Sequence, residues 1–325
     1  MHRPPAPLLR YIDQVVGGDD TSIDFRYSRS VLTDFDVDVV HVLESHLDEL
    51  LGTKDAGSLQ RLLAAFALIR NLRKHRIGLV RTLPGLKADD LPQRKPSFTD
   101  RLLDRATTAF VVFDESTRTP VPSRTTVIPH AQFHERFSGY PRAEMIEGRV
   151  LCIHRGRLTA AARGLVAIPR VSHLAGITVR FAGYADERLE QDLRFAAVRH
   201  PSTVSTRLGH LSDGARVQEI EAAELVAIPE IRTLTDLQTV FLALTLRRPL
   251  ITPYTPQMAA LAQRVGPTWI HLSDGRITAK AVDDTFNQLR QIASRQSATL
   301  RVPDLSSTRA AYASLFRKAA QATRR

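Results

Sequence analysis

Short apolar runs alternate along the chain with longer segments in which apolar residues recur every three or four positions. The short runs are rich in β-branched residues, which is typical of strands that are buried on both faces of a parallel sheet. The longer segments have the period of amphipathic helices. This rhythm of strand, helix and strand predicts an α/β protein built on parallel sheets.

In the first half of the chain, the pattern predicts four strands and two helices. The strands are expected at residues 37–43, 77–80, 109–113 and 126–128, and the helices at residues 8–16 and 58–76. The long helix 58–76 is expected to turn one apolar stripe toward the core: Leu62, Leu63, Phe66, Ile69 and Leu72.

The second half repeats the rhythm after a polar stretch at residues 136–147, so we place a domain boundary near Gly148. Strands are expected at residues 150–153, 177–182, 225–228, 250–252 and 269–272. Helices are expected at residues 187–199, 217–223, 236–246, 256–265, 281–294 and 306–322. The predicted division is therefore residues 1–148, residues 149–300 and a C-terminal helical segment at 301–325.

Length and composition agree with this division. A chain of 325 residues is long enough for about two domains. Its 43% hydrophobic and 24% charged residues are ordinary globular usage and exclude wholesale disorder. The longest apolar run covers only residues 62–69, against the ~20 residues that a membrane-spanning helix needs. With no apolar segment of signal-peptide length at the start and a single Cys152, which cannot form an internal disulfide, the expected location is the cytoplasm.

The net charge of +11 favours an anionic partner, which could be nucleic acid, an acidic membrane face or a phosphorylated small molecule. Aromatic residues make up only 6% of the chain, and single-strand binding needs aromatic stacking surfaces, so no nucleic-acid partner is expected. The basic end of the long predicted helix fits an anionic membrane at its inner face: Arg70, Arg73, Lys74 and Arg76. A solvated basic surface is the alternative interpretation.

The most informative motif lies at residues 150–164, where a predicted strand runs into a glycine turn and two arginines follow. Arg157 and Arg163 are six residues apart, and Gly164 follows the second. Arginines supply charge and forked donors for phosphate, and glycines let the backbone approach a ligand closely. The spacing is compatible with a diphosphate site, and a solvated loop is the alternative.

This segment resembles the donor-binding region of GT-B glycosyltransferases, specifically a divergent member of the large retaining group 1 (family 4-like). In that family a glycine, an arginine and a lysine–glycine pair hold the nucleotide diphosphate. Arg157 matches the family arginine, and Arg163 with Gly164 stands where lysine–glycine is usual. The resemblance continues in order through residues 30–295, in these stretches: 35–43, 127–131, 176–183, 208–213, 222–229 and 242–252.

The resemblance implies two Rossmann-like domains whose parallel sheets face a central cleft. Residues 1–148 would bind the acceptor and residues 149–300 the nucleotide-sugar donor, while the last helix would cross back to the first domain. Gly209 and His210 would flank the nucleotide base. Gln238 and Thr239 fall in the turn that presents backbone amides to the phosphates.

Several family features are absent from this sequence. The two family glutamates fall at Leu234 and Leu242, with Glu230 as a possible substitute in space. The family histidine after the first-domain strand falls at residues 83–85, which contain none. The usual first strand with its glycine-rich loop is also missing.

The predicted function is transfer of a hexose from a nucleotide diphosphate sugar to a cell-envelope glycolipid or polysaccharide precursor. Three residues leaving the 37–43 strand are weak catalytic candidates: His41, Glu44 and His46. No cofactor and no metal are expected beyond the nucleotide sugar itself, which is the substrate. The alternative is a non-catalytic GT-B-like scaffold or partner subunit in envelope polysaccharide synthesis, which the absent family residues favour.

Overall fold

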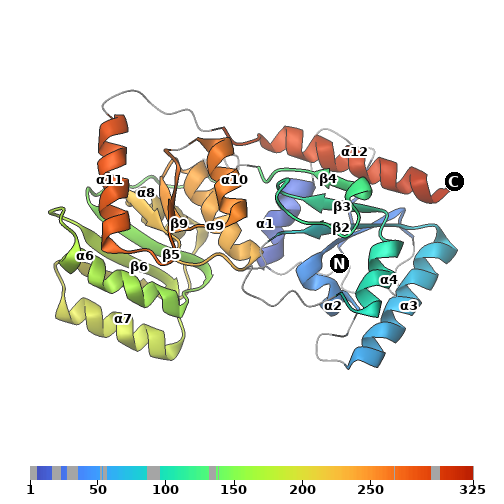
Figure 1. Cartoon of the computed structure of the whole chain (residues 1–325), viewed down its shortest axis with the longest axis horizontal. Coiled ribbons are helices and arrows are strands. Elements are labelled where there is room, and N and C mark those ends of the chain that lie inside the picture. The colour runs from blue at the N-terminus through green and yellow to red at the C-terminus, as the bar shows by residue number, and fades with distance from the viewer. Residues whose placement is uncertain are drawn as a thin grey trace. The chain divides into compact units, whose positions relative to one another are not determined.

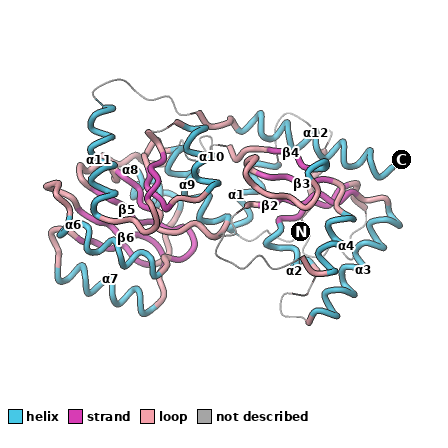
Figure 2. Tube along the Cα trace, in the orientation of Figure 1, coloured by secondary structure: helices cyan, strands magenta, loops and turns pink. Residues whose placement is uncertain are grey.

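The computed structural model describes residues 6–16, 23–27, 36–51, 53, 57–85, 96–131, 137, 139–266, 268–293 and 301–324. The chain forms two compact units, which we call unit 1 (Met1–Ala131 with Pro303–Arg325) and unit 2 (Gln132–Val302). Each unit contains one parallel β-sheet flanked by helices (Figures 1 and 2). The predicted α/β class with two parallel sheets is therefore confirmed.

The sheet of unit 1 has its strands in chain order, β1-β2-β3-β4, and every pair is parallel. Its strands are β1 (Val39–Leu43), β2 (Gly78–Leu83), β3 (Ala109–Val112) and β4 (Thr125–Val127). All four predicted strands are thus present. Within the described part of unit 1, no strand precedes β1.

The helices of unit 1 are α1 (Ala6–Val15), η1 (Glu44–His46), α2 (Leu47–Leu50), α3 (Ser58–His75), α4 (Phe98–Ala106), η2 (Pro122–Arg124) and α12 (Leu305–Arg324). Helix α4 is absent from the sequence prediction. Its signal was a capping box, in which Ser97 accepts from the Asp100 amide and Asp100 accepts from the Ser97 amide. Such a box marks a helix start even when few apolar residues follow.

The two faces of this sheet carry different helices. Side chains alternate along β2, so that Leu79 packs into the core with Leu68 and Leu72 of α3, while Thr82 faces α1 and α12. On that second face, the Tyr11 hydroxyl lies 2.7 Å from Thr82 Oγ1 and 2.9 Å from the Tyr312 hydroxyl. These bonds fix the first and last helices of the chain on the same sheet.

One part of the predicted core of unit 1 is wrong. Leu63 and Phe66 do not face inward: they are 60% and 47% exposed. The buried face of α3 is formed by Ala65, Leu68, Ile69 and Leu72. Because α3 is apolar around most of its circumference, periodicity could not show which stripe packs against the sheet.

Unit 2 contains a six-stranded sheet of order β10-β9-β8-β5-β6-β7, again with every pair parallel. Its strands are β5 (Arg149–Arg157), β6 (Thr178–Tyr184), β7 (Val204–Leu208), β8 (Leu225–Ala227), β9 (Leu250–Pro253) and β10 (Ile270–Ser273). Strand β7 was not predicted. Its central residues, Ser205 to Arg207, are polar, as an edge strand allows.

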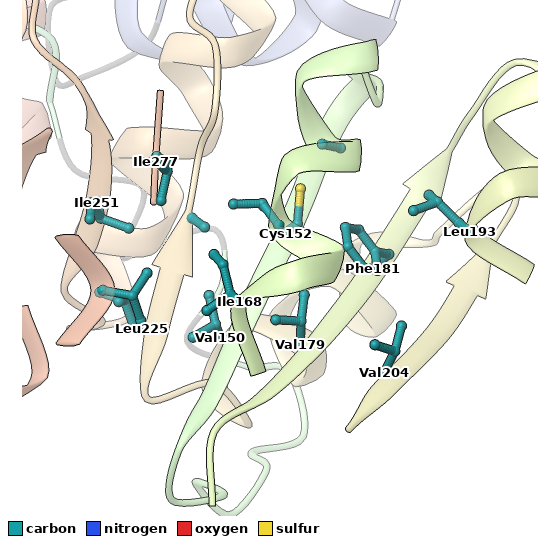
Figure 3. Packing of buried hydrophobic residues seen from close by; sticks show 14 of the residues in the cluster. Val150, Cys152, Ile168, Val179, Phe181, Leu193, Val204, Leu225, Ile251 and Ile277 are labelled. Atoms are coloured by element: carbon teal, nitrogen blue, oxygen red, sulfur yellow. The ribbon is translucent and has the colours of Figure 1, made fainter. Parts of the chain in front are cut away.

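The helices of unit 2 are η3 (Ala160–Ala167), α6 (Ile168–Val171), α7 (Glu187–Arg199), α8 (Asp213–Glu221), α9 (Leu234–Thr245), α10 (Pro256–Val265) and α11 (Ala279–Ala293). Figure 3 shows an apolar cluster of unit 2, in which Val150 and Cys152 of β5 pack with Val179 and Phe181 of β6. Burial raises the pKa of the Cys152 thiol to about 12, so this cysteine is an inert core residue.

Unit 2 begins upstream of the domain boundary predicted at Gly148. The segment before Gly148 belongs to unit 2 because α8 holds it. Arg142 pairs with Glu221, the Ala143 amide donates to Glu221 at 3.0 Å, and the Ile146 amide donates to the Ala222 carbonyl at 3.0 Å. The assignment of acceptor and donor roles to the two domains stays a prediction.

None of the helices in the described part of the chain combines the length and apolarity needed to cross a membrane.

Buried histidines make the stability of unit 1 pH-dependent. His130 is 2% exposed, accepts a 2.7 Å hydrogen bond from Gln14 Nε2, and has its pKa lowered from 6.5 to about 4 by burial. The unfolded chain therefore takes up a proton before the folded chain as pH falls from about 6.5 to about 4. At pH 5.0 this should cost about 2 kcal/mol of unfolding free energy relative to pH 7.5.

We expect the thermal midpoint followed by circular dichroism to fall over this range, and His130→Gln to flatten the fall. His173→Gln, at an exposed position, is the control and should leave the profile unchanged. A His130→Gln profile as steep as that of the parent protein would contradict the assignment.

Candidate functional site

The carboxyl edge of the six-stranded sheet in unit 2 is the candidate site. Strand β5 is followed in the chain by β6 on one side, while its other neighbour is β8. The direction of chain progression therefore reverses between β5 and β8. In doubly wound sheets, ligands bind beyond the carboxyl ends of the strands at such a reversal. Arg157 ends β5, Gly209 follows β7 and Glu230 follows β8, so the fold brings these predicted donor residues to one edge.

Strand β5 ends in an irregular segment. Ile153 is paired with Ala182, but the next pair is Arg157 with Tyr184, so four steps along β5 correspond to two along β6. The extra residues bulge out of the ladder immediately before Arg157. The backbone of Arg157 is described, but its side chain lies outside the described part of the chain, and its diphosphate role stays a prediction.

Two glycines with positive φ join the neighbouring strand ends. Gly183 (φ +115°) is the second-last residue of β6 and Gly209 (φ +116°) follows β7. The Gly209 amide donates to the Gly183 carbonyl at 3.0 Å. A Cβ atom on Gly183 would lie 2.8 Å from the His154 carbonyl oxygen, whereas one on Gly209 would meet nothing within 4 Å. His210 follows in an exposed position, as a residue beside a bound base would.

The segment that was expected to present amides to phosphates is helical. Asp236, Gln238 and Thr239 lie in the first turns of α9 rather than in an open turn. Asp236 forms a capping box with Thr233, and its Oδ2 accepts from the backbone amides of Arg232 and Thr233, both at 2.8 Å. Its carboxylate therefore interacts with the positive end of its own helix.

Gln238 and Thr239 are only 2% and 3% exposed. The Thr239 hydroxyl donates to the Thr235 carbonyl at 3.2 Å, which is a bond within the helix. Both side chains are therefore part of the packing around α9. The sequence had placed these two residues in the turn that contacts the donor phosphates.

Sequence reasoning assigned no role to His154, which lies in the bulged end of β5. Its ring is 4% exposed, and Nδ1 lies 3.2 Å from Asp236 Oδ1. Within the described residues, neither nitrogen of this ring forms a hydrogen bond, and Asp236 is a charge neighbour of Nδ1 only. The only signal in the sequence was a histidine at the end of an apolar strand, directly before the Arg-Gly-Arg triplet.

The remaining donor-side candidates form ion pairs. Arg163, in η3, pairs through Nε with Asp192 Oδ2 of α7 at 2.6 Å, and both side chains are about half exposed. Gly164 follows in an open position. Glu230 pairs with Arg232 just before α9.

Two of the three catalytic candidates make contacts within unit 1 that position helices and strands. His41 Nε2 lies 2.9 Å from Thr82 Oγ1 and 3.2 Å from the Tyr11 hydroxyl, and burial lowers the pKa of His41 to about 4. Glu44 accepts from Arg81 Nη2 at 2.7 Å, and the same guanidinium donates to Asp104 at 2.7 Å. His46 lies in η1 with its side chain partly exposed.

A cavity of about 950 Å³ runs along the edge strand β10 between α10 and α11, and contains none of the predicted donor residues. In the part of the chain that the structure describes, no group of histidine, cysteine and acidic side chains could hold a metal ion.

Comparison of the sequence with curated proteins finds two relatives, both from Xanthomonas campestris pv. campestris. Each is a GDP-mannose:glycolipid 4-beta-D-mannosyltransferase that is 25% identical to this chain over 251 residues, which are 77% of this chain and 71% of the relative. The chain is a distant homologue of GT-B glycosyltransferases.

Solved structures agree with a GT-B fold. Anabaena HepE in complex with UDP and glucose superposes with a TM-score of 0.51 at 12% identity, over 80% of this chain and 74% of that one. HepE in complex with UDP alone superposes with a TM-score of 0.50 at 13% identity, over 80% and 75%. No protein-family model matches the sequence.

The close approach at Gly183 gives a matched test of this edge. Alanine at Gly183 or at Gly209 should each cost about 1–3 kcal/mol of unfolding free energy, because both φ values are ones that side chains rarely adopt. Gly183→Ala should cost more, since its Cβ also collides with the His154 carbonyl. Fluorescence of Trp269, the single tryptophan, reports unfolding of unit 2 in urea. Equal costs at the two positions would rule out the close approach.

Proposed function

We propose that this protein transfers a hexose from a nucleotide diphosphate sugar to a cell-envelope glycolipid or polysaccharide precursor. The homology to glycolipid mannosyltransferases carries this proposal. The unit 2 sheet supports it by placing Arg157 and Glu230 at the chain reversal between β5 and β8, with Gly209 farther along the same carboxyl edge, after β7. By analogy with the relatives, GDP-mannose is the first donor to test and a lipid-linked glycan the first acceptor.

In this proposal, Arg157 and Arg163 neutralise the diphosphate as it leaves, which stabilises charge that develops in the transition state. Arg163 must then leave Asp192. That pair is about half exposed, and exposed ion pairs contribute only about 0–1 kcal/mol. A hydrogen bond to a charged group contributes about 1.5–3 kcal/mol, so a diphosphate can compete for this guanidinium.

The other donor contacts are proposed at the same edge. Gly209 and His210 would flank the base, and Gly164 would let the phosphates approach the backbone. Glu230 would take the place of a family glutamate if it exchanges Arg232 for a sugar hydroxyl. Gln238 and Thr239 would act by packing the start of α9 rather than by direct contact, since both are buried.

The acceptor hydroxyl must lose its proton during transfer, and a base in hydrogen-bonding reach would accept it. His41 and Glu44 are engaged with Thr82 and Arg81, which favours a structural role for both. His46, in η1 with a partly exposed side chain, stays the third candidate for the base.

We propose a cytoplasmic location at the inner face of the membrane, where a lipid-linked acceptor would be found. Arg70, Arg73, Lys74 and Arg76 are exposed along the last turns of α3 and just after it. Basic residues near an acidic leaflet contribute about 1 kcal/mol each, enough together for reversible association.

A non-catalytic role as a scaffold or partner subunit is the second candidate. It is favoured by the two family-glutamate positions, which are Leu234 and Leu242 here, with Leu242 buried in α9. This role predicts a folded protein that neither binds a nucleotide sugar nor transfers its sugar.

A thermal-shift screen with GDP, UDP, ADP and their sugars separates the two candidates. A ligand at a hundred times its dissociation constant stabilises the protein by about 2.7 kcal/mol, so a donor site should raise the melting temperature with one nucleotide, expected to be GDP. The scaffold role becomes the better explanation if none of these ligands raises it.

Arg157→Ala should weaken binding of that nucleotide by about 1.5–3 kcal/mol, because a hydrogen-bonded charge partner of the diphosphate is lost. Isothermal titration calorimetry measures the change. Arg199→Ala is the control, since this exposed arginine ends α7 and parallel topology places it at the opposite edge of the sheet. A loss under about twofold (under 0.5 kcal/mol) for Arg157→Ala would exclude it from the site.

A further inference from the structure

His154 is a buried polar residue for which the described structure offers no hydrogen bond. It lies at the end of β5, shortly before Arg157, and is 4% exposed. Neither ring nitrogen has a hydrogen-bond partner among the described residues. Buried polar side chains of folded proteins are nearly always hydrogen-bonded, because an unpaired buried group costs stability. A buried imidazole in this state is therefore suited to a partner that comes from outside the chain, such as a ligand.

Two neighbouring segments fix the position of His154. A Cβ atom on Gly183 would lie 2.8 Å from the His154 carbonyl oxygen, so glycine is what lets β6 approach the end of β5 this closely. On the side of the ring, Nδ1 lies 3.2 Å from Asp236 Oδ1 in the first turn of α9. His154 is thus held at the chain reversal between β5 and β8, next to the start of the helix that follows β8.

Asp236 brings a negative charge to the edge where the donor diphosphate is proposed to bind. Its side chain is 6% exposed, and its Oδ2 accepts from the backbone amides of Arg232 and Thr233. These amides belong to the start of α9, and amides at a helix start are groups that would otherwise be available to an anion. A diphosphate at this edge would therefore be repelled by a buried carboxylate unless a nearby positive charge offsets it.

Among the described ion pairs, the partner of Asp236 is His154. Asp236 is the titratable residue of α9, and β8 contains none. The other titratable side chains near the end of β5 come from the segments that follow the strands: Arg155, Arg157, Tyr184, Asp186, Glu230 and Arg232. Glu230 pairs with Arg232, and Asp186 caps α7. The side chains of Arg155 and Arg157 lie outside the described part of the chain.

The charge of the His154 ring depends on the anions beside it. Burial disfavours a charged imidazole, whereas a neighbouring anion favours it. In the free protein, the anion beside this ring among the described residues is Asp236. A bound diphosphate would be a second anion. An imidazolium has two N–H donors, which is one for each of these anions.

We propose that His154 takes up a proton when the nucleotide diphosphate sugar binds. The imidazolium then donates from Nδ1 to Asp236 and from Nε2 to a diphosphate oxygen. Both buried nitrogens gain a partner, and the charge of Asp236 at the site is cancelled. The proton comes from solvent, and no covalent bond of the donor forms or breaks in this step. This inference deepens the proposed function and rests on it, because the donor supplies the second anion.

Isothermal titration calorimetry of the full chain tests the proton uptake, with GDP-mannose as the first donor. The donor is titrated at about pH 7, where histidine can change its charge, in buffers that differ in ionisation enthalpy. The slope of the observed enthalpy against that ionisation enthalpy gives the protons taken up. The diphosphate of a nucleotide sugar has no ionisable proton near neutral pH, so the uptake belongs to the protein. We expect net uptake by the parent protein and none by His154→Gln.

A double-mutant cycle separates this role from simple packing. His154→Gln should weaken donor binding by about tenfold, because a charge-assisted hydrogen bond is lost and Asp236 is no longer offset. Asp236→Asn removes the charge that the imidazolium cancels, and it keeps an oxygen that can accept from the helix amides. Added to His154→Gln, it should therefore recover most of the lost affinity. Two residues that act only by packing would give no such recovery.

The matched control is His173→Gln, which makes the same change at an exposed position before β6. Parallel topology places His173 near the opposite edge of the sheet, so donor affinity and proton uptake should both stay unchanged. Melting temperatures without ligand confirm that all variants fold.

Donor binding without proton uptake, or with an uptake that persists in His154→Gln, would overturn the inference and leave the proposed function standing. A double variant that binds the donor no better than His154→Gln would overturn it too. If no nucleotide sugar binds to the parent protein, the proposed function and this inference are both wrong.

Discussion

Parallel strand pairing is the constraint on which the rest of this structure depends. Every strand pair in the described chain is parallel, so successive strands need crossover connections, here mostly helices, and both faces of each sheet need a cover. The same constraint puts the carboxyl ends of all strands of a sheet at one edge, together with the N-termini of the helices that follow them. In unit 2 the candidate donor residues lie at that edge. In unit 1 the exposed apolar residues at the starts of α3 and α4 lie there.

The two units meet this constraint differently. In unit 2 the chain reverses between β5 and β8, so its helices cover both faces and a ligand crevice is expected at the reversal. In unit 1 the strands follow in chain order, and the helices between β1, β2 and β3 cover one face only. The other face is covered by α1 and α12, held through Tyr11, Thr82 and Tyr312. Two helices from the ends of the chain thus complete a core that the crossovers leave open.

Several polar residues that the sequence suggested for the site form contacts that hold helix and strand ends in place. Asp236 looked unfavourable for a diphosphate in the sequence, yet its carboxylate caps α9 and approaches His154 at the end of β5. His41 and Glu44 looked available for chemistry, but Thr82 and Arg81 engage them. In each case a long-range partner decided the role, and such partners are separated by tens of residues in the chain.

Local sequence patterns were enough to predict the fold class, four strands of unit 1 and five of unit 2, because short β-branched runs and helical periodicity are local properties. The sequence also determined the homology, through ordered stretches that include Arg157 and Arg163. The folded structure was needed to show which face of α3 is buried and that β7 pairs as an edge strand. Those outcomes depend on competition between surfaces of similar hydrophobicity and on contacts between distant segments, which no local pattern encodes.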